Sequence, residues 1–119
     1  MERRGGIRVV VDLPGEALPA GGGDAVPVRV RDLSEGGAQI QCTARGSERL
    51  APGANCLNDS GRLLELELVC CPDQTALKIR CRVVFVRRIA HDEYRIGLRY
   101  ADPLQTDLLA LKQFIRGQR

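Results

Sequence analysis

Short runs in which apolar and polar residues alternate are the feature that most constrains the fold of this 119-residue chain. Residues 26–31 alternate three valines with Pro27 and two arginines, and residues 64–68 alternate leucine with glutamate. A period of two places one side of a strand on a core and the other side in water. Such runs predict six strands, at residues 7–11, 26–31, 38–42, 64–70, 79–85 and 94–100.

The segments between these runs are expected to be loops. Leu13-Pro14-Gly15 would end the first strand, and residues 15–24, with three consecutive glycines, read as a flexible connection. Residues 45–60 are polar and rich in turn formers, which predicts an irregular loop.

Residues 103–116 have the pattern of a helix. Asp102 is placed to cap it, Pro103 suits the first helical position, and Gln105 completes a capping-box arrangement. Gly117 marks its end. One apolar stripe is expected, formed by Leu104, Leu108, Leu111 and Ile115.

These elements predict a mainly β fold, a small six-stranded antiparallel barrel over residues 7–100 with a C-terminal α-helix over one end or side. The length suits a single domain, residues 1–119, with one modest core. With 44% hydrophobic and 28% charged residues, the composition is that of an ordinary globular protein.

Two polar clusters flank the first two predicted strands. The first begins at Arg4 and ends at Arg8, and the second runs from Asp32 through Ser34 to Gly37. An arginine fork pairs bidentately with phosphate oxygens or with the O6/N7 edge of guanine. A carboxylate accepts from the guanine N–H groups, a hydroxyl donates to oxygen, and glycine lets backbone approach closely. Together the clusters suit a small ligand that carries phosphates and guanine bases.

In this order and at this separation, the clusters resemble the paired motifs of the PilZ domain, the bacterial receptor module for cyclic di-GMP. The first reads R-x-x-x-R and the second D-x-S-x-x-G. The first pattern alone is a weak signal in a chain with 16 arginines, and the second alone is common, because Asp, Ser and Gly are ordinary turn formers. The resemblance covers Arg3 to about Ile115 and implies a six-stranded barrel with a C-terminal helix.

The resemblance implies that a flexible segment, residues 1–8, wraps around cyclic di-GMP. Arg4 and Arg8 would contact phosphate and a guanine Hoogsteen edge. A basic residue before the motif, here Arg3, tends to accompany a stacked ligand pair in the family, so two nucleotides per chain are expected. Gly5-Gly6 departs from the bulkier residues common there and raises the entropic cost of ordering the segment.

The second cluster would complete the same site. By the resemblance, Asp32 and Ser34 hold the other guanine face and phosphate, and Gly36 and Gly37 permit close approach. The ordered segment would then form a surface that an unidentified effector protein reads, in control of motility, biofilm or polysaccharide. Binding without catalysis is expected, with no cofactor besides the ligand.

Two other functions stay open at this level. A PilZ-fold adaptor that works through protein partners without nucleotide usually lacks the arginines or the Asp/Ser pair, and this chain keeps both. An OB-like barrel for single-stranded nucleic acid needs exposed aromatic side chains on its strands. The four aromatic residues all fall at core positions of the pattern, so no DNA or RNA partner is expected: Phe85, Tyr94, Tyr100 and Phe114.

Catalytic and metal chemistry find no support in the sequence. The single histidine, His91, lies in a polar turn, and the serines have no adjacent base. The five cysteines lack metal-ligand spacing, and Cys42, Cys70 and Cys81 fall at buried strand positions. Free cysteines, no signal-peptide pattern and no apolar run of membrane-spanning length indicate a cytoplasmic protein without a membrane span.

A basic set on the last two predicted strands has three possible partners: the ligand, a protein, or glutamates across the sheet. The sequence does not separate them. The set comprises Arg80, Arg82, Arg87, Arg88, Arg95 and Arg99.

Overall fold

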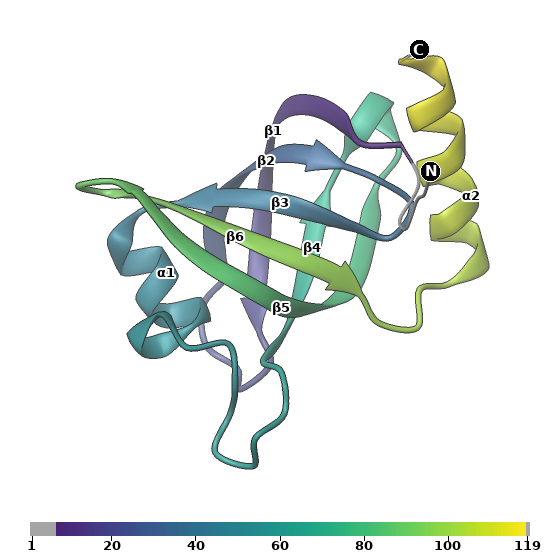
Figure 1. Cartoon of the computed structure of the whole chain (residues 1–119). Helices are drawn as coiled ribbons and strands as arrows, with labels where there is room; N and C mark the ends of the chain where they lie inside the picture. Colours follow the sequence, from purple (N-terminus) through teal and green to yellow (C-terminus); the bar gives the residue numbers. More distant parts are fainter. Residues whose placement is uncertain (1–6, 119) are drawn as a thin grey trace.

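Six antiparallel strands close into a barrel in the order β1-β2-β3-β6-β5-β4 (Figure 1). The computed structural model describes residues 7–118. The expected antiparallel barrel with a C-terminal helix is confirmed. The strands are β1 (Val9–Pro19), β2 (Val26–Leu33), β3 (Gly37–Cys42), β4 (Glu65–Cys70), β5 (Leu77–Ala90) and β6 (Glu93–Tyr100).

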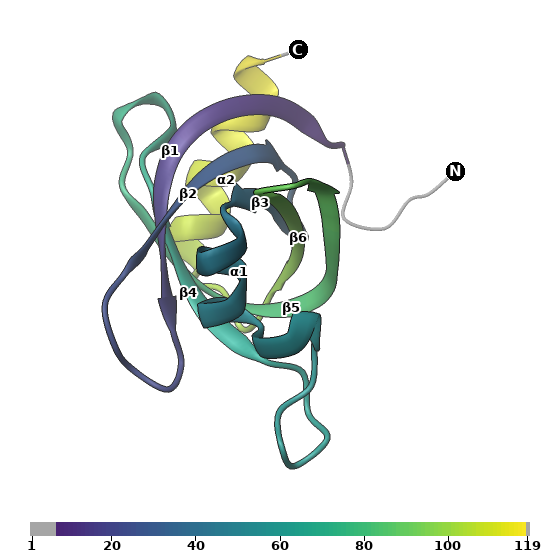
Figure 2. The same ribbon diagram turned by 90° about the vertical axis from the view of Figure 1, so that its left-hand side faces the viewer.

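Two α-helices lie at opposite ends of the barrel (Figures 1 and 2). Helix α1 (Ala44–Leu50) covers the end where β3 stops and the β5–β6 hairpin projects. Helix α2 (Gln105–Gly117) lies near the other end of the barrel and packs against β5. Two short 3₁₀ turns, Pro52–Ala54 and Pro72–Gln74, complete the order. Among the described residues, no helix combines the length and apolar character needed to cross a membrane.

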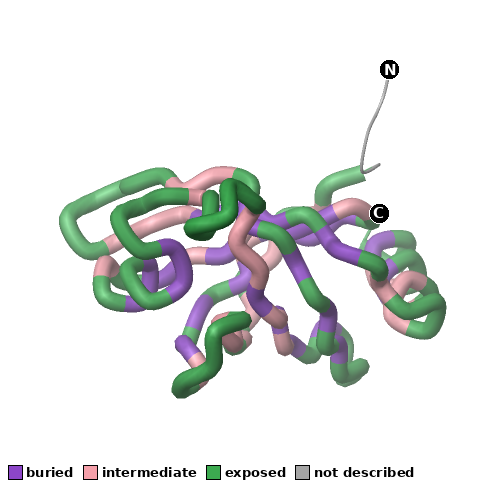
Figure 3. The backbone as a smooth tube through the Cα atoms, turned by 90° about the horizontal axis from the view of Figure 1, so that it is seen from below, coloured by how far each residue is buried: buried purple, intermediate pink, exposed green. Residues whose placement is uncertain are grey.

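The core fills the barrel interior with the alternating residues that the sequence pattern selects. Along β2, β4 and most of β5, buried and less buried positions alternate. Figure 3 shows buried and exposed stretches alternating along the chain. Cys42, Cys70 and Cys81 are free and buried, as expected. Burial raises the pKa of the Cys42 thiol to about 11 and that of Cys81 to about 12, so both stay neutral small hydrophobes at physiological pH.

Strand β1 is longer than the sequence pattern predicts, and the expected loop at residues 15–24 is wrong over its first half. The strand runs on past Pro14 and Gly15 to Pro19. Pairing with β4 begins only at Gly15, so the missing N–H of Pro14 removes no bond from that ladder. A Cβ at Gly15 would lie 2.9 Å from the carbonyl oxygen of Val69, which explains why glycine continues the strand here.

Helix α1 replaces part of the irregular loop expected at residues 45–60. Its N-cap, Thr43, accepts the N–H of Gly46 at 3.1 Å through its hydroxyl, and Asp92 accepts the N–H of Ala44 at 2.8 Å. Its seven residues are too few to show an apolar stripe in the sequence. Long-range capping by Asp92 from the β5–β6 hairpin is a tertiary contribution, so sequence periodicity could not reveal it.

Helix α2 starts two residues later than predicted. Asp102 has φ = 48° and pairs with Arg80 at 3.2 Å, so it does not cap the helix, and Leu104 is the N-cap residue. Leu104 is 67% exposed and does not belong to the apolar stripe, whereas Leu111 and Ile115 are buried against the barrel. The predicted end at Gly117 agrees with the structure.

A β-bulge in β5 turns Phe85 out of the barrel. Val83 pairs with Leu98 and both are buried, but the register then shifts, and Phe85 pairs with Gly97. One extra residue in a strand moves every following side chain to the opposite face. The expectation that Phe85 is a core residue is therefore wrong: its ring covers Gly97, where an added Cβ would overlap it.

Candidate functional site

The turn between β2 and β3 is held by the side chain of Ser34. Its hydroxyl accepts the N–H groups of Gly36 at 3.3 Å and Gly37 at 3.2 Å and donates to the carbonyl oxygen of Gly37 at 3.2 Å. Ser34 is buried, and its own N–H donates to the same carbonyl at 2.9 Å. The hydroxyl is thus engaged by the turn, and its direct role here is to set the turn geometry.

Tyr100 fastens this turn to the end of β6. Its phenol donates to the carbonyl oxygen of Ser34 at 3.0 Å, and its N–H donates to the carbonyl oxygen of Gly36 at 3.0 Å. Burial raises the pKa of Tyr100, so the phenol stays protonated and remains a donor. The turn is therefore fixed from two sides before any ligand arrives.

Gly37 is required by strand packing. A Cβ at this position would overlap the carbonyl oxygen of Leu98 on β6. Because that atom is backbone, no side-chain rotation can make room for it. Glycine here permits β3 and β6 to approach, and it also leaves the outer surface beside the turn without a side chain.

Asp32 lies near the end of β2 and pairs with the guanidinium group of Arg8. Its side chain is only 11% exposed, and Arg8 Nη1 is 3.9 Å from one carboxylate oxygen. Burial raises the pKa of Asp32, while Arg8, Arg95 and the N–H of Gln39 lower it in part. The carboxylate thus carries a desolvation cost that its own partners only partly offset.

Arg95, on β6, is near enough for its positive charge to lower the pKa of Asp32. Its Nη1 donates to the side-chain oxygen of Gln39 at 3.3 Å, while its Nε is buried and has no hydrogen-bond partner among residues 7–118. Buried donors are nearly always satisfied in proteins. The Nε of Arg95 is therefore a candidate contact for a ligand acceptor.

Four residues on the outer faces of four neighbouring strands form one row across the sheet, which begins at Asp32. Strand register pairs Asp32 with Gln39, Gln39 with Gly97, and Gly97 with Phe85. A surface pocket of about 510 Å³ covers this row from Gln39 onward, with Arg8 and the Ser34–Gly37 turn on one side and Phe85 on the other. Such a volume is typical of small-molecule sites.

The structure brings most of the predicted site residues together. Arg8, Ser34, Gly36 and Gly37 line the pocket, and Asp32 lies beside it, paired with Arg8. Arg3 and Arg4 lie outside the described residues, as do the two glycines that follow them. The flexibility expected of residues 1–8 stays a prediction for that reason.

The sequence did not reveal four further residues of this region. Tyr100 and Phe85 were assigned to the core, and Gln39 and Gly97 carried no signal at all. An alternation pattern gives a strand and a face but not which strands are neighbours, so it does not predict a cross-strand row.

The basic set on β5 and β6 divides into different environments. Arg80 and Arg82 pair with Glu65 on β4, at 3.9 and 3.4 Å. Arg87 lies over the ring of Phe85, and Arg88 contacts the β5–β6 turn, in which His91 is exposed as expected. Only Arg95 and Arg99 join the region of the candidate site, Arg95 beside Asp32 and Arg99 in the pocket wall.

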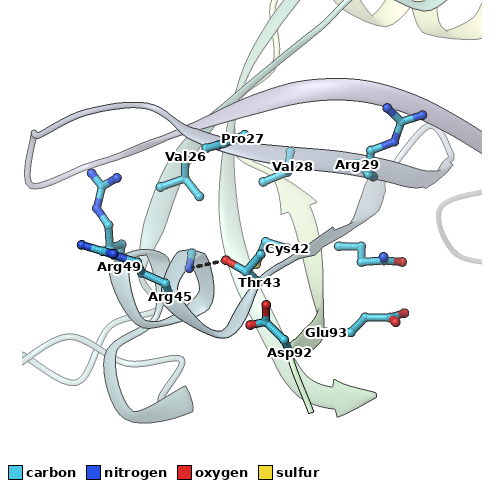
Figure 4. Close-up of a pocket in the computed structure, with 12 residues that line it drawn as sticks. Val26, Pro27, Val28, Arg29, Cys42, Thr43, Arg45, Arg49, Asp92 and Glu93 are labelled. Carbon is cyan, nitrogen blue, oxygen red and sulfur yellow. Dashed lines mark hydrogen bonds between the residues drawn. The ribbon is translucent and has the colours of Figure 1, made fainter. Parts of the chain in front are cut away.

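A second pocket of about 510 Å³ lies at the α1 end (Figure 4). Its walls come from the start of β2, the end of β3, helix α1 and the β5–β6 hairpin, with Val26 and Val28 facing Cys42 and Thr43. None of the predicted site residues that the structure describes lines it.

Comparison with solved structures identifies the same architecture in several proteins. The PilZ domain with c-di-GMP of YcgR from Escherichia coli is 13% identical, with a TM-score of 0.65 over 99% of this chain and 92% of that one. The PilZ domain of CeSA from a cellulose-synthesizing bacterium is 17% identical, with a TM-score of 0.58 over 93% and 96%. The inhibitor of motility MotI/DgrA of Bacillus subtilis is 20% identical, with a TM-score of 0.68 over 99% of this chain and 52% of that one.

These identities are low, so the structural matches establish the fold alone. A search of curated proteins found no significant sequence match. The sequence profile of the PilZ domain, however, matches residues 2–117, nearly the whole chain. Together with the barrel, its C-terminal helix and the two motifs, that match shows that the chain belongs to the PilZ domain family.

Proposed function

We propose that this protein is a receptor for cyclic di-GMP that binds the ligand without catalysis and passes its presence to a protein partner. The observation that carries the proposal is the buried Asp32, which Arg8 and Arg95 flank beside a preformed pocket. Guanine offers N1–H and N2–H donors to a carboxylate and an O6/N7 edge to arginine. One PilZ domain of the same fold, that of YcgR, is described with c-di-GMP, which supports this ligand class.

In this proposal Arg4 and Arg8 grip the phosphates and a Hoogsteen edge, while Asp32 accepts from the guanine N–H groups. Ser34, Gly36 and Gly37 shape the turn that holds the site open. The ligand phosphates pair with the two arginines, and this pairing orders the N-terminal segment against the barrel. The ordered segment forms a new surface for the effector.

Stoichiometry and cellular setting are part of the proposal. Arg3 adds a third guanidinium, so we propose that two stacked nucleotides bind per chain and that Arg3→Leu lowers this number toward one while binding persists. The three buried free thiols suit a reducing compartment, and we place the receptor in the cytoplasm.

Isothermal titration calorimetry with cyclic di-GMP tests the proposal. We expect binding by the wild type, weaker binding by Asp32→Ala, and loss of roughly a hundredfold or more in Arg4→Ala/Arg8→Ala, because each charge-assisted hydrogen bond contributes about 1.5–3 kcal/mol. Arg62→Ala, in the exposed loop before β4, is the matched control and should bind like the wild type.

Competition experiments address specificity. Cyclic di-AMP and GTP should compete poorly, because adenine lacks O6 and the N1–H and N2–H donors, and GTP lacks the second base. Equal binding of cyclic di-AMP would contradict the assignment of Asp32. Wild-type binding by the double arginine variant would place the ligand elsewhere, and no binding by the wild type would favour an adaptor that works through protein partners alone.

A further inference from the structure

The pocket at the α1 end has no role in the proposed function, and its floor is apolar. Val26 and Val28 on β2 face Cys42 at the end of β3, and all three residues are buried (Figure 4). Small-molecule sites of this size are mostly apolar, with a few polar groups that orient the ligand. The pocket therefore has the volume and the lining that suit a small, partly apolar molecule.

This pocket lies where strands β2 and β3 separate. Their pairing stops at Arg29 and Gln41, whereas β2 continues back to Val26 and stays paired with β1. Helix α1 and the β5–β6 hairpin border the gap without filling it. The course of the backbone thus sets the opening, which is present before any molecule binds.

Five charged side chains line the pocket, and three of them already have partners: Arg29, Arg49 and Asp92. The other two, Arg45 and Glu93, form no side-chain hydrogen bond or ion pair within the described part of the chain. Figure 4 places Arg45 and Arg49 at one side of the pocket and Glu93 at the other. An anionic group is therefore favoured at the α1 side, where Arg45 is free to pair with it.

We infer that this pocket binds a small amphipathic carboxylate, a molecule with one carboxylate group and an unbranched apolar chain. Arg45 pairs with the carboxylate, and Arg49 beside it adds positive charge. The chain lies against Val26 and Val28, where it displaces water from apolar surface. Glu93 at the opposite side disfavours a second anionic group there. This site is separate from the one proposed for cyclic di-GMP.

Isothermal titration calorimetry with decanoate as the probe tests the inference. We expect decanoate to bind and octanoate to bind roughly tenfold more weakly, because two fewer methylene groups are buried. Decylammonium, which has the same chain length and the opposite charge, should bind more weakly than either. Tighter binding of decylammonium than of decanoate would show that Asp92 and Glu93 dominate the pocket, and it would overturn the inference.

Variants of the wall test whether the probe occupies this pocket. Arg45→Glu should weaken decanoate binding roughly tenfold or more, through loss of a charge-assisted hydrogen bond. Arg116→Glu is the matched control, because it makes the same change of charge at an exposed position of α2 outside the pocket. It should bind like the wild type, and equal losses in the two variants would reduce the effect to general charge attraction.

A third variant changes the space in the pocket and no charge. Gly46→Ala places a methyl group 3.0 Å from a Val26 methyl and 3.2 Å from the Cβ of Cys42, so it narrows the floor. Decanoate binding should weaken severalfold, while urea denaturation shows whether the fold persists. Unchanged affinity in both Gly46→Ala and Arg45→Glu would place the probe elsewhere.

Backbone amide chemical shifts measured by NMR locate the probe directly. Decanoate should move the resonances of Val28 and Gly46 and leave those of the Ser34–Gly37 turn in place. The exposed Leu104 and Leu109 of α2 are the alternative apolar surface, and shifts confined to that helix would contradict the inference. Cyclic di-GMP is absent from these experiments, so a failure of this site leaves the receptor function standing, and a failure of the receptor function leaves this site standing.

Discussion

The pocket at the α1 end and the pocket beside the β2–β3 turn have the same volume, about 510 Å³, but differ in how their polar groups are satisfied. At the α1 end, Arg29 is held by Asp12, and Arg49 donates to the carbonyl oxygen of Asp24. At the turn end, Asp32 is buried beside a long, 3.9 Å ion pair with Arg8.

The comparison shows that pocket size does not identify the site. A group already bonded within its own chain must break that bond to hold a ligand, so it contributes little net affinity. At the turn end, the buried Nε of Arg95 has no partner in the described part of the chain. Incomplete satisfaction of the buried Asp32, rather than volume, distinguishes the turn end from the α1 end.

The largest expected difference between the two ends concerns their glycines. Gly37→Ala should lower the free energy of unfolding by about 3 kcal/mol or more, because the new Cβ meets the Leu98 carbonyl oxygen and backbone cannot yield. Gly46→Ala in α1 should stay within about 1 kcal/mol of the wild type, since the gain in helix propensity offsets a 3.0 Å contact with a Val26 methyl. Urea denaturation checks both, and equal losses would contradict the packing described for β3 and β6.

Ligand binding should distinguish an arginine at one end from an arginine at the other. Arg8→Ala should weaken cyclic di-GMP binding roughly tenfold to a hundredfold, through loss of a charge-assisted hydrogen bond. Arg45→Ala, in the wall of the α1-end pocket, should leave affinity unchanged. Calorimetry at one fixed ionic strength measures both. A comparable loss for Arg45→Ala would mean that the ligand occupies the α1 end or that long-range charge dominates.

Two hydroxyl groups of similar structural importance should differ in function. Tyr100→Phe removes the bond to Ser34, and Thr43→Ala removes the cap of α1, so each should cost about 1 kcal/mol of stability. Only Tyr100→Phe should also weaken cyclic di-GMP binding, by loosening the turn. Thermal unfolding and calorimetry on the same samples provide the comparison, which fails if Thr43→Ala affects binding equally.

The smallest expected effect is a shift in Tm when one aspartate at each end is replaced, and the shift has opposite signs at the two ends. Because burial raises the pKa of Asp32 above its ordinary value of 3.8, its stabilising contribution is complete at lower pH and is lost as pH rises through the raised pKa. Asp32→Asn should therefore raise the Tm of the free protein slightly at pH 7 relative to the wild type, with no gain at pH 3.

Asp92→Ala, by contrast, should lower the Tm at pH 7, since Asp92 accepts the N–H of Ala44 at the start of α1. Thermal unfolding followed by circular dichroism at both pH values measures the pair. A lower Tm for Asp32→Asn at pH 7 would show that the flanking guanidinium groups more than offset the burial of Asp32.

Strand patterns with a period of two predicted a small antiparallel barrel, and the family resemblance named the fold. The alternation at residues 26–31 and 64–70 matches β2 and β4 within two residues, because each strand has one face in the core. Local signals failed where a contact from elsewhere in the chain decides the structure. Asp102 had the sequence context of a helix cap, but its pairing with Arg80 and its left-handed backbone place it before the helix.

The sequence by itself determined the family, the six strands and the two polar clusters, because these depend on residue type and spacing along the chain. Only the tertiary structure decided what surrounds those clusters. Closure of the barrel places Gln39, Gly97 and Phe85 in one row with Asp32 and brings Arg95 to its carboxylate. A bulge of one residue turned Phe85 from the core to the pocket, since every later side chain in a strand changes face when the register shifts by one.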